Sequence, residues 1–237
     1  MPKNIDEVFQ DVEACISKGR IDSYRQPGDD QRDVIAHYLW HLHLYESLYP
    51  SLHALELTLR NKMHAGISDY FEDANWFMRD EIIVYRQHRE DVLSTIGQLD
   101  SRGKTVAPSN IVATIDFSFW TGLFSANYER SNRPDTGNAL WPALIRIVFP
   151  TAQGNERSLK SLRAKLTAIR HFRNEVYHYD TRSRSLAEIT TLHDQTIELI
   201  GWMDPTMKEL ILSIDRFVQA ADPKAKKHIN AGLEKYL

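Results

Sequence analysis

Disulfides, long apolar runs and a charge excess are all missing from this chain of 237 residues. Cys15 is the only cysteine, which excludes an internal disulfide framework and a cysteine-based zinc cluster and favours a reducing compartment. No run of about 18 apolar residues occurs, so no membrane-spanning helix is predicted. The formal net charge is −3, so no overall basic field indicates a nucleic-acid binder, although a local basic site is compatible with this value. We therefore expect a cytoplasmic protein with no membrane partner.

Glycine and proline are also infrequent, with 10 and 9 residues, and they fall between segments of helical periodicity. Apolar residues make up 42% of the chain, which is enough for a substantial core. The pattern predicts an all-α fold in a single domain over residues 1–237, with its core at about 37–220. The N-terminal helix (4–18, ended by Gly19) and the C-terminal tail (221–237) are predicted to be peripheral.

A long helix is predicted from residue 37 to about 67, although Pro50 should start or kink it. Its apolar residues recur at spacings of three and four, which places them on one buried stripe. This stripe consists of Leu48, Leu52, Leu55, Leu59 and Met63. A second, polar stripe on the same helix consists of His53, Glu56, Arg60 and His64. We interpret the polar stripe as a second functional face.

The remaining pattern predicts helices at residues 79–99, 111–128, 159–179 and 186–200. Gly201 is expected to end the last of these helices. Asp204 and Pro205 are expected to cap and begin a final long helix. The segment at 111–128 is predicted to be core because it contains Phe117, Phe119, Trp120, Leu123 and Phe124.

The helix at 159–179 carries the candidate chemistry near its end. At about 100° per residue, Arg170, Asn174 and His178 fall on one stripe, with His178 opposite the core. Arg173 lies closer to the apolar seam, where a guanidinium requires a carboxylate or phosphate partner. Because His178 points away from its own core, a desolvated site can form there only if something else covers it, and a second copy of this helix across a two-fold axis would do so. We expect a symmetric homodimer with a composite cleft.

An arginine, an amide and an imidazole within two helical turns can cleave RNA without a metal or cofactor. His178 would take or give a proton near neutral pH and promote attack of the 2′-OH on the scissile phosphate, which yields a 2′,3′-cyclic phosphate. Arg173, supported by Arg170, would hold the phosphate, while Asn174 would orient the substrate or His178. DNA lacks this hydroxyl and should not be cut.

Simpler interpretations of the same residues remain open. The pattern Arg-x4-His often occurs by chance, and the arginine and histidine could flank an ordinary surface salt bridge with Glu175. Glu56 could pair with Arg60 four residues later, or it could hold Arg173 across a helix interface and orient it.

Three separated segments, at residues 55–61, 117–123 and 169–178, carry a resemblance to a known family. In this order they resemble the Abi-like proteins of bacterial abortive-infection and toxin–antitoxin systems, which belong to the HEPN superfamily. The resemblance implies a HEPN-like helical bundle with additional helices, a dimer that joins two Arg-x4-6-His motifs, and metal-independent RNA cleavage. By position, the motif residues are Arg173, Asn174 and His178. The predicted substrate-binding or supporting residues are Arg170, Glu56, Arg60 and Tyr177.

The surroundings of the motif histidine depart from the family pattern. Many members have a small residue and a second histidine there, whereas Tyr177 precedes His178 and Tyr179 follows it. Some HEPN toxins carry a tyrosine two residues after the histidine as a target for nucleotide modification, and Asp180 occupies that position here. Control by such modification is therefore not expected. A cognate antitoxin or regulatory protein is a further partner that the resemblance allows.

Two other classes of function fit parts of the sequence. A HEPN module could bind RNA or a protein without cutting, since the same fold also serves non-catalytic roles. A metal-dependent hydrolase would need clustered ligands; His37, His41 and His43 lie close together, but no nearby pattern completes a site. We expect these histidines to cap or line a helix surface.

Overall fold

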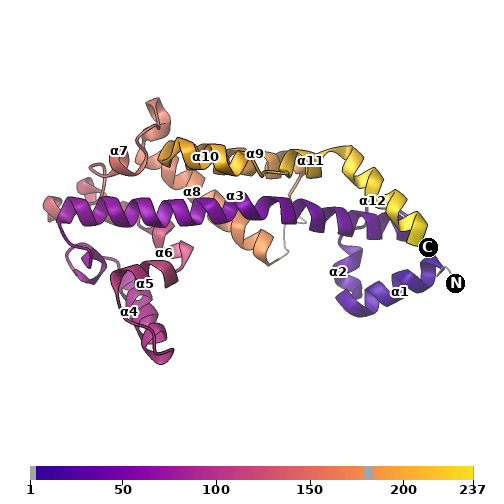
Figure 1. The fold of residues 1–237 in the computed structure, drawn as a ribbon, viewed down its shortest axis with the longest axis horizontal. Helices are drawn as coiled ribbons and strands as arrows, with labels where there is room; N and C mark the ends of the chain where they lie inside the picture. Colours follow the sequence, from indigo (N-terminus) through magenta and orange to yellow (C-terminus); the bar gives the residue numbers. More distant parts are fainter. Residues whose placement is uncertain (1–3, 179–183, 237) are drawn as a thin grey trace. The chain divides into compact units, whose positions relative to one another are not determined.

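The computed structural model describes residues 4–178 and 184–236, and these ranges fold almost entirely into helices (Figure 1). Within them are twelve α-helices, five short 3-10 helices and one isolated bridge between Glu129 and Trp141, but no β-strand. The predicted all-α fold class is confirmed, whereas its HEPN-like detail stays a prediction. No helix in the described ranges combines the length and the apolar character that crossing a membrane requires.

The α-helices are α1 (Ile5–Ile16), α2 (Lys18–Asp22), α3 (Gln31–Phe71), α4 (Arg86–Ser101), α5 (Pro108–Thr114), α6 (Phe117–Gly122), α7 (Ile145–Val148), α8 (Leu159–Tyr177), α9 (Leu186–Met203), α10 (Pro205–Leu212), α11 (Phe217–Ala221) and α12 (Pro223–Tyr236). The 3-10 helices are η1 (Trp76–Met78), η2 (Ala126–Tyr128), η3 (Arg130–Asn132), η4 (Thr136–Asn138) and η5 (Gly154–Arg157).

The chain forms two compact units. Unit 1 comprises Met1–Pro50, Glu175–Thr191 and Ser213–Leu237, and unit 2 comprises Ser51–Asn174 and Leu192–Leu212. Helices α3, α8 and α9 each contribute residues to both units. The single domain over residues 1–237 stays a prediction.

Unit 1 has its own apolar cluster, to which the N-terminal helix and the C-terminal tail both contribute. The buried members of the cluster are Val8, Phe9, Ile21, Tyr24, Val34 and Ile35. Leu233 of α12 packs against them. The indole N–H of Trp40 donates to the Ala220 carbonyl at 3.0 Å and so joins α3 to α11. The N-terminal helix therefore supplies two buried residues, Val8 and Phe9, to this cluster, whereas the tail contributes the partly buried Leu233. The peripheral position of the two segments stays a prediction.

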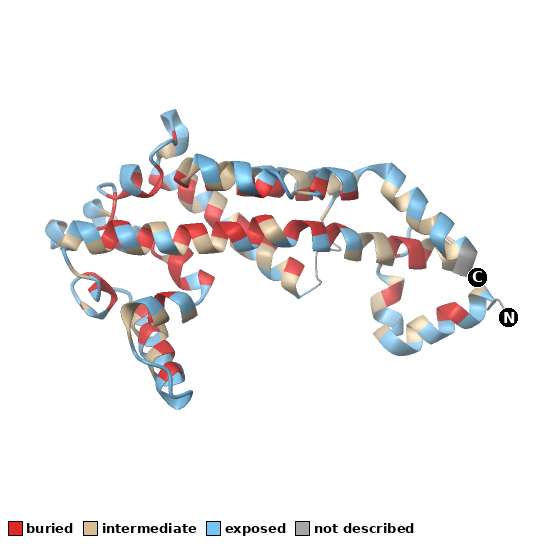
Figure 2. Cartoon of the chain, in the orientation of Figure 1, coloured by how far each residue is buried: buried red, intermediate tan, exposed pale blue. Residues whose placement is uncertain are grey.

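The apolar stripe of α3 is buried as predicted, and Figure 2 shows buried residues recurring along this helix. Its members Leu48, Leu52, Leu55, Leu59 and Met63 are each at most 2% exposed. The helix is longer than predicted and continues through Pro50. Proline lacks one backbone donor, but the burial of the flanking Leu48 and Leu52 offsets the loss of a single hydrogen bond.

The aromatic segment of unit 2 is core, as predicted, but it is not one helix. Its five predicted core residues are all buried. Helix α5 ends at Thr114, and α6 begins at Phe117 after the extended residues Ile115 and Asp116. The β-branched residues before the break have low helix propensity, so the aromatic packing sets the chain direction instead.

Several predicted helix ends are wrong. Gly19 lies inside α2, because α1 already ends before Ser17, which has φ 73°. Gly201 lies inside α9, which ends at Met203. The helix predicted at 79–99 begins only at Arg86, and the predicted final long helix is divided into α10, α11 and α12. Asp204 does cap α10, since its carboxylate accepts from the Met207 N–H at 3.1 Å.

Candidate functional site

Helix α8 presents the candidate motif near its C-terminal end. Its apolar side is formed by Leu162, Leu166, Ile169, Phe172 and Val176, each at most 3% exposed. Burial of this side fixes the direction of the polar residues between them. Asn174 is exposed, and Arg170 and Arg173 are half-buried. His178 follows the last helical residue and is exposed, as the sequence predicted.

Glu56 of α3 holds Arg173. The guanidinium Nη2 donates to the carboxylate Oε2 at 3.0 Å, and the two side chains are only 26% and 20% exposed. The Nη1 atom of Arg173 donates to the Asn174 side-chain oxygen at 3.2 Å. One guanidinium therefore links a carboxylate of α3 to the amide of the motif. Of the two pairings that the sequence left open for Glu56, the structure contains the one with Arg173.

The other polar residues of α3 contact different segments of unit 2. Arg60 Nη1 donates to the Ala113 carbonyl at 3.1 Å. His64 Nδ1 accepts from the Trp76 indole N–H at 3.1 Å, and burial lowers the pKa of the His64 imidazole. The polar stripe is therefore divided: Glu56 reaches the motif, whereas Arg60 and His64 attach α3 to neighbouring segments.

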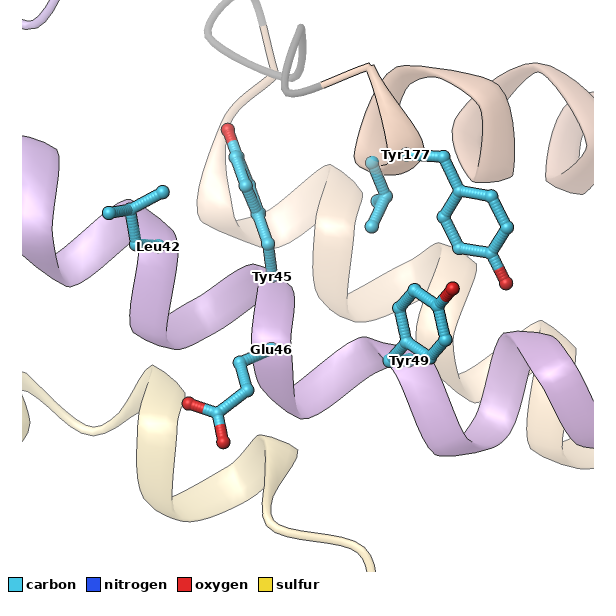
Figure 3. Close-up of a pocket in the computed structure, with 6 residues that line it drawn as sticks. Leu42, Tyr45, Glu46, Tyr49 and Tyr177 are labelled. Carbon is cyan, nitrogen blue, oxygen red and sulfur yellow. The ribbon is translucent and has the colours of Figure 1, made fainter.

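Tyr177 anchors the end of α8 on Tyr49 of α3 in unit 1. The two rings stack with centroids 4.8 Å apart and an interplanar angle of 23° (Figure 3). They belong to a pocket of about 520 Å³ that is lined by Leu42, Tyr45, Glu46, Tyr49, Val176 and Tyr177. Tyr49 is 54% exposed, so an aromatic surface is open to solvent beside the residue that precedes His178. The Glu46 carboxylate points away from the two rings and pairs with Arg216 at 3.4 Å.

Glu175 pairs with Arg184, which follows the motif. Arg184 Nη2 donates to Glu175 Oε1 at 2.8 Å, and its Nε donates to the other carboxylate oxygen. The hydrogen bond that Arg184 donates to Glu175 raises the pKa of the Arg184 guanidinium. This pair links the C-terminal end of α8 to Arg184, which lies two residues before the start of α9. Tyr179 and Asp180, where the sequence departs from the family pattern, lie outside the described residues.

Arg170 lines a polar pocket with residues of α4, α6 and η2. Sequence reasoning assigned Arg170 to the phosphate of the motif and missed its neighbours His88, Ser125 and Asn127. These residues come from separate elements and share no regular spacing, so no sequence pattern groups them. The one signal that singles out a residue among them is the burial of a polar ring, His88, which is 6% exposed.

Two of the three early histidines, His37 and His41, take structural positions in unit 1, whereas His43 is exposed on α3 as predicted. The His37 ring is buried, and its Nδ1 lies 3.1 Å from the Tyr24 carbonyl, so it does not line a helix surface as predicted. His41 Nδ1 lies 3.2 Å from the Tyr45 hydroxyl, and burial lowers the pKa of His41 to about 4. Among the residues that the structure describes, no group of three His, Cys, Asp or Glu side chains is arranged to hold a metal ion.

Comparisons with protein-family models, with curated proteins and with solved structures found no match. The resemblance to Abi-like proteins therefore rests on the three sequence segments. The structure adds an all-α fold and a contact between the first and third of these segments, through Glu56 and Arg173.

Proposed function

We propose that this protein is a metal-independent endoribonuclease of the HEPN type that acts in abortive infection or as the toxin of a toxin–antitoxin system. The observation that carries this proposal is the position of Arg173. Its guanidinium is oriented by Glu56 and donates to Asn174, on the helix that ends directly before the exposed His178. A cation, an amide and an imidazole are thus presented at one end of α8.

In the proposed reaction, His178 accepts the proton of the ribose 2′-OH or donates one to the departing 5′-oxygen. The 2′-oxygen attacks the phosphorus, the bond to the 5′-oxygen breaks, and a 2′,3′-cyclic phosphate forms. Arg173 stabilises the charge that grows on the phosphate oxygens, and Asn174 orients the substrate. The exposed ring of Tyr49, which stacks on the half-buried Tyr177, supports the proposal, because such rings stack on unpaired bases.

The ion pair also favours a composite site. Glu56 orients Arg173 but offsets its charge, so a phosphate at a single copy of α8 gains hydrogen bonds with little net attraction. A homodimer that brings a second α8 to the site would add a second arginine and histidine and would cover the exposed imidazole. Dissociation of the dimer, or binding of an antitoxin over α8, would silence the enzyme.

The alternative function is a HEPN module that binds RNA or a protein partner without cutting. The open Tyr49–Tyr177 surface favours it, since base stacking does not require His178.

Cleavage of mixed RNA in excess chelator tests the proposal. We expect the wild-type protein to shorten RNA and leave DNA of the same sequence intact, while Arg173→Ala and His178→Ala leave both intact. His171→Ala is the matched control, because it removes an exposed histidine of α8 outside the motif stripe and should retain cleavage. Equal cleavage by all variants would remove the motif from the chemistry. Binding of RNA without cleavage by any of them would favour the non-catalytic module.

A further inference from the structure

A pocket of about 550 Å³ lies in unit 2, and we call it the α4–α8 pocket. It is lined by Tyr85, Gln87, His88, Asp91, Ser118, Gly122, Ser125, Asn127 and Arg170. Apart from Tyr85 and Gly122, all of these residues have an amide, a hydroxyl or an ionisable side chain. A pocket with this lining is suited to a polar ligand.

Arg170 supplies a positive charge to this pocket. Its side chain is half-buried, and no carboxylate in the described part of the chain pairs with it. A half-buried guanidinium without a counter-ion is costly, so an anion placed against it would be stabilised. Asp91 also lines the pocket, and it keeps its negative charge because its Oδ1 accepts a hydrogen bond from the neutral Gln87 amide at 3.2 Å. Arg170 is the one arginine or lysine among the lining residues, so an anion would bind on the Arg170 side of the pocket.

The pocket also holds hydrogen-bonding groups that a ligand could use. Ser125 Oγ is buried and has no hydrogen-bond partner among the described residues. The N-cap residue of α4, Tyr85, makes no side-chain capping bond. The His88 N–H donates to the Tyr85 carbonyl at 3.0 Å, so the Arg86 and Gln87 N–H groups are the ones in the first turn of this 16-residue helix that an acceptor could use. A buried hydroxyl and uncapped amides both favour a bound polar group.

His88 is held in one orientation at the wall of the pocket. The Tyr128 hydroxyl oxygen lies 2.7 Å from His88 Nδ1, and the two rings stack with an interplanar angle of 14°. Gly122 faces the Nε2 atom of the same imidazole, and a Cβ at position 122 would lie 2.4 Å from it. Burial lowers the pKa of His88, which keeps the imidazole neutral near pH 7. His88 therefore completes a preorganised wall.

An aromatic ring borders the same pocket. Tyr85 is 48% exposed and meets the His88 ring edge to face, with centroids 5.2 Å apart. An exposed tyrosine beside side-chain amides can recognise an unpaired base, because the ring stacks on the base and the amides hydrogen-bond to the edge of the base.

We propose that the α4–α8 pocket binds one nucleotide of single-stranded RNA, with the phosphodiester on Arg170 and the base against Tyr85, Gln87 and Asn127. One arginine matches the single charge of a phosphodiester better than the double charge of a terminal phosphate. This inference rests on the proposed function in that RNA is the ligand, but it does not require His178. The pocket would then be a substrate-recognition site separate from the cleavage motif.

Binding of a labelled, 2′-O-methylated single-stranded RNA, which 2′-OH attack cannot cut, tests the pocket in the full-length protein by fluorescence anisotropy. Arg170→Ala should weaken binding at least fivefold and reduce the dependence on salt by about one ion. Lys160→Ala, which removes an exposed charge from the same helix outside the pocket, should change affinity less than twofold. Tyr85→Ala should weaken binding, whereas Tyr85→Phe should retain it.

Equal affinities for Arg170→Ala and Lys160→Ala would overturn the inference, as would displacement of the RNA by an equimolar mononucleotide. Asn127→Ala, at an exposed residue, replaces Arg170→Ala if the latter does not fold. Arg170-dependent binding by a protein that never cuts RNA would contradict the proposed nuclease and retain the pocket. Conversely, a protein that cuts RNA but whose affinity for RNA is unchanged by Arg170→Ala would retain the proposed nuclease and contradict the pocket.

Discussion

Arg173 donates a hydrogen bond to Glu56 across 117 positions of sequence, at 3.0 Å. The contact joins α8 to α3 inside unit 2 and orients the arginine of the candidate motif. It also connects two of the three segments that resemble Abi-like proteins. The central claim about function depends on this relationship.

Removal of either partner should destabilise the protein. Both side chains are about three-quarters buried, so Glu56→Ala or Arg173→Ala leaves a poorly solvated charge and should cost about 1–2 kcal/mol in free energy of unfolding. The double variant should lose less than the sum, with a coupling energy of about 1 kcal/mol. Urea unfolding of the four proteins measures this value. The exposed pair Arg86–Glu90 of α4 is the matched control and should show a much smaller coupling energy. Additive losses at Glu56 and Arg173 would contradict the account.

Gly122 should not tolerate a side chain. A Cβ there would meet His88 Nε2 at 2.4 Å and Cε1 at 2.8 Å, and the His88 ring is fixed by Tyr128. Gly122→Ala should therefore lower the free energy of unfolding by about 1–3 kcal/mol. Gly97→Ala, in α4 with open space around it, is the control and should raise stability by about 0.5–1 kcal/mol. Thermal unfolding of both variants gives the comparison, and a stabilised Gly122→Ala would show that His88 is free to move.

Acid should destabilise unit 1 through His41. Burial lowers the pKa of this imidazole from 6.5 to about 4, so below pH 6.5 the unfolded chain binds a proton that the folded chain does not. The free energy of unfolding should therefore fall as the pH decreases from 6.5 to about 4, by at most about 3 kcal/mol from this residue. Urea unfolding at several pH values should show a shallower slope for His41→Gln. Part of the slope should remain, because burial also lowers the pKa of His64 and His88. An unchanged slope would show that His41 is not the source.

The long helices could be predicted because one side of each is buried along its whole length. The stripe from Leu48 to Met63 and the apolar side of α8 both follow directly from spacing. Helix ends were predicted less well, since they depend on contacts distant in sequence. Gly201 continues α9, and the Lys208 side chain occupies the space beside it, where a Cβ would lie 2.6 Å from Cδ.

The candidate site was predictable only in part, for the same reason. A guanidinium near the apolar seam of α8 needs a carboxylate or a phosphate, and the sequence allowed Glu56 as that carboxylate, but it equally allowed Glu56 to pair with Arg60. Nothing comparable indicates the α4–α8 pocket, because Arg170, His88 and Ser125 meet only once the chain has folded.

The most direct test of the nuclease follows the fate of a single phosphate. An RNA with one mapped cleavage site is incubated in excess chelator with the wild-type protein or His178→Ala, beside the same RNA carrying a 2′-deoxy nucleotide at that site. We expect the wild-type protein to leave a 2′,3′-cyclic phosphate on the RNA, to leave the deoxy position uncut, and His178→Ala to cut neither. Cleavage at the deoxy position, or equal cleavage by His178→Ala, would contradict attack by the 2′-OH with His178 as the proton-transfer group.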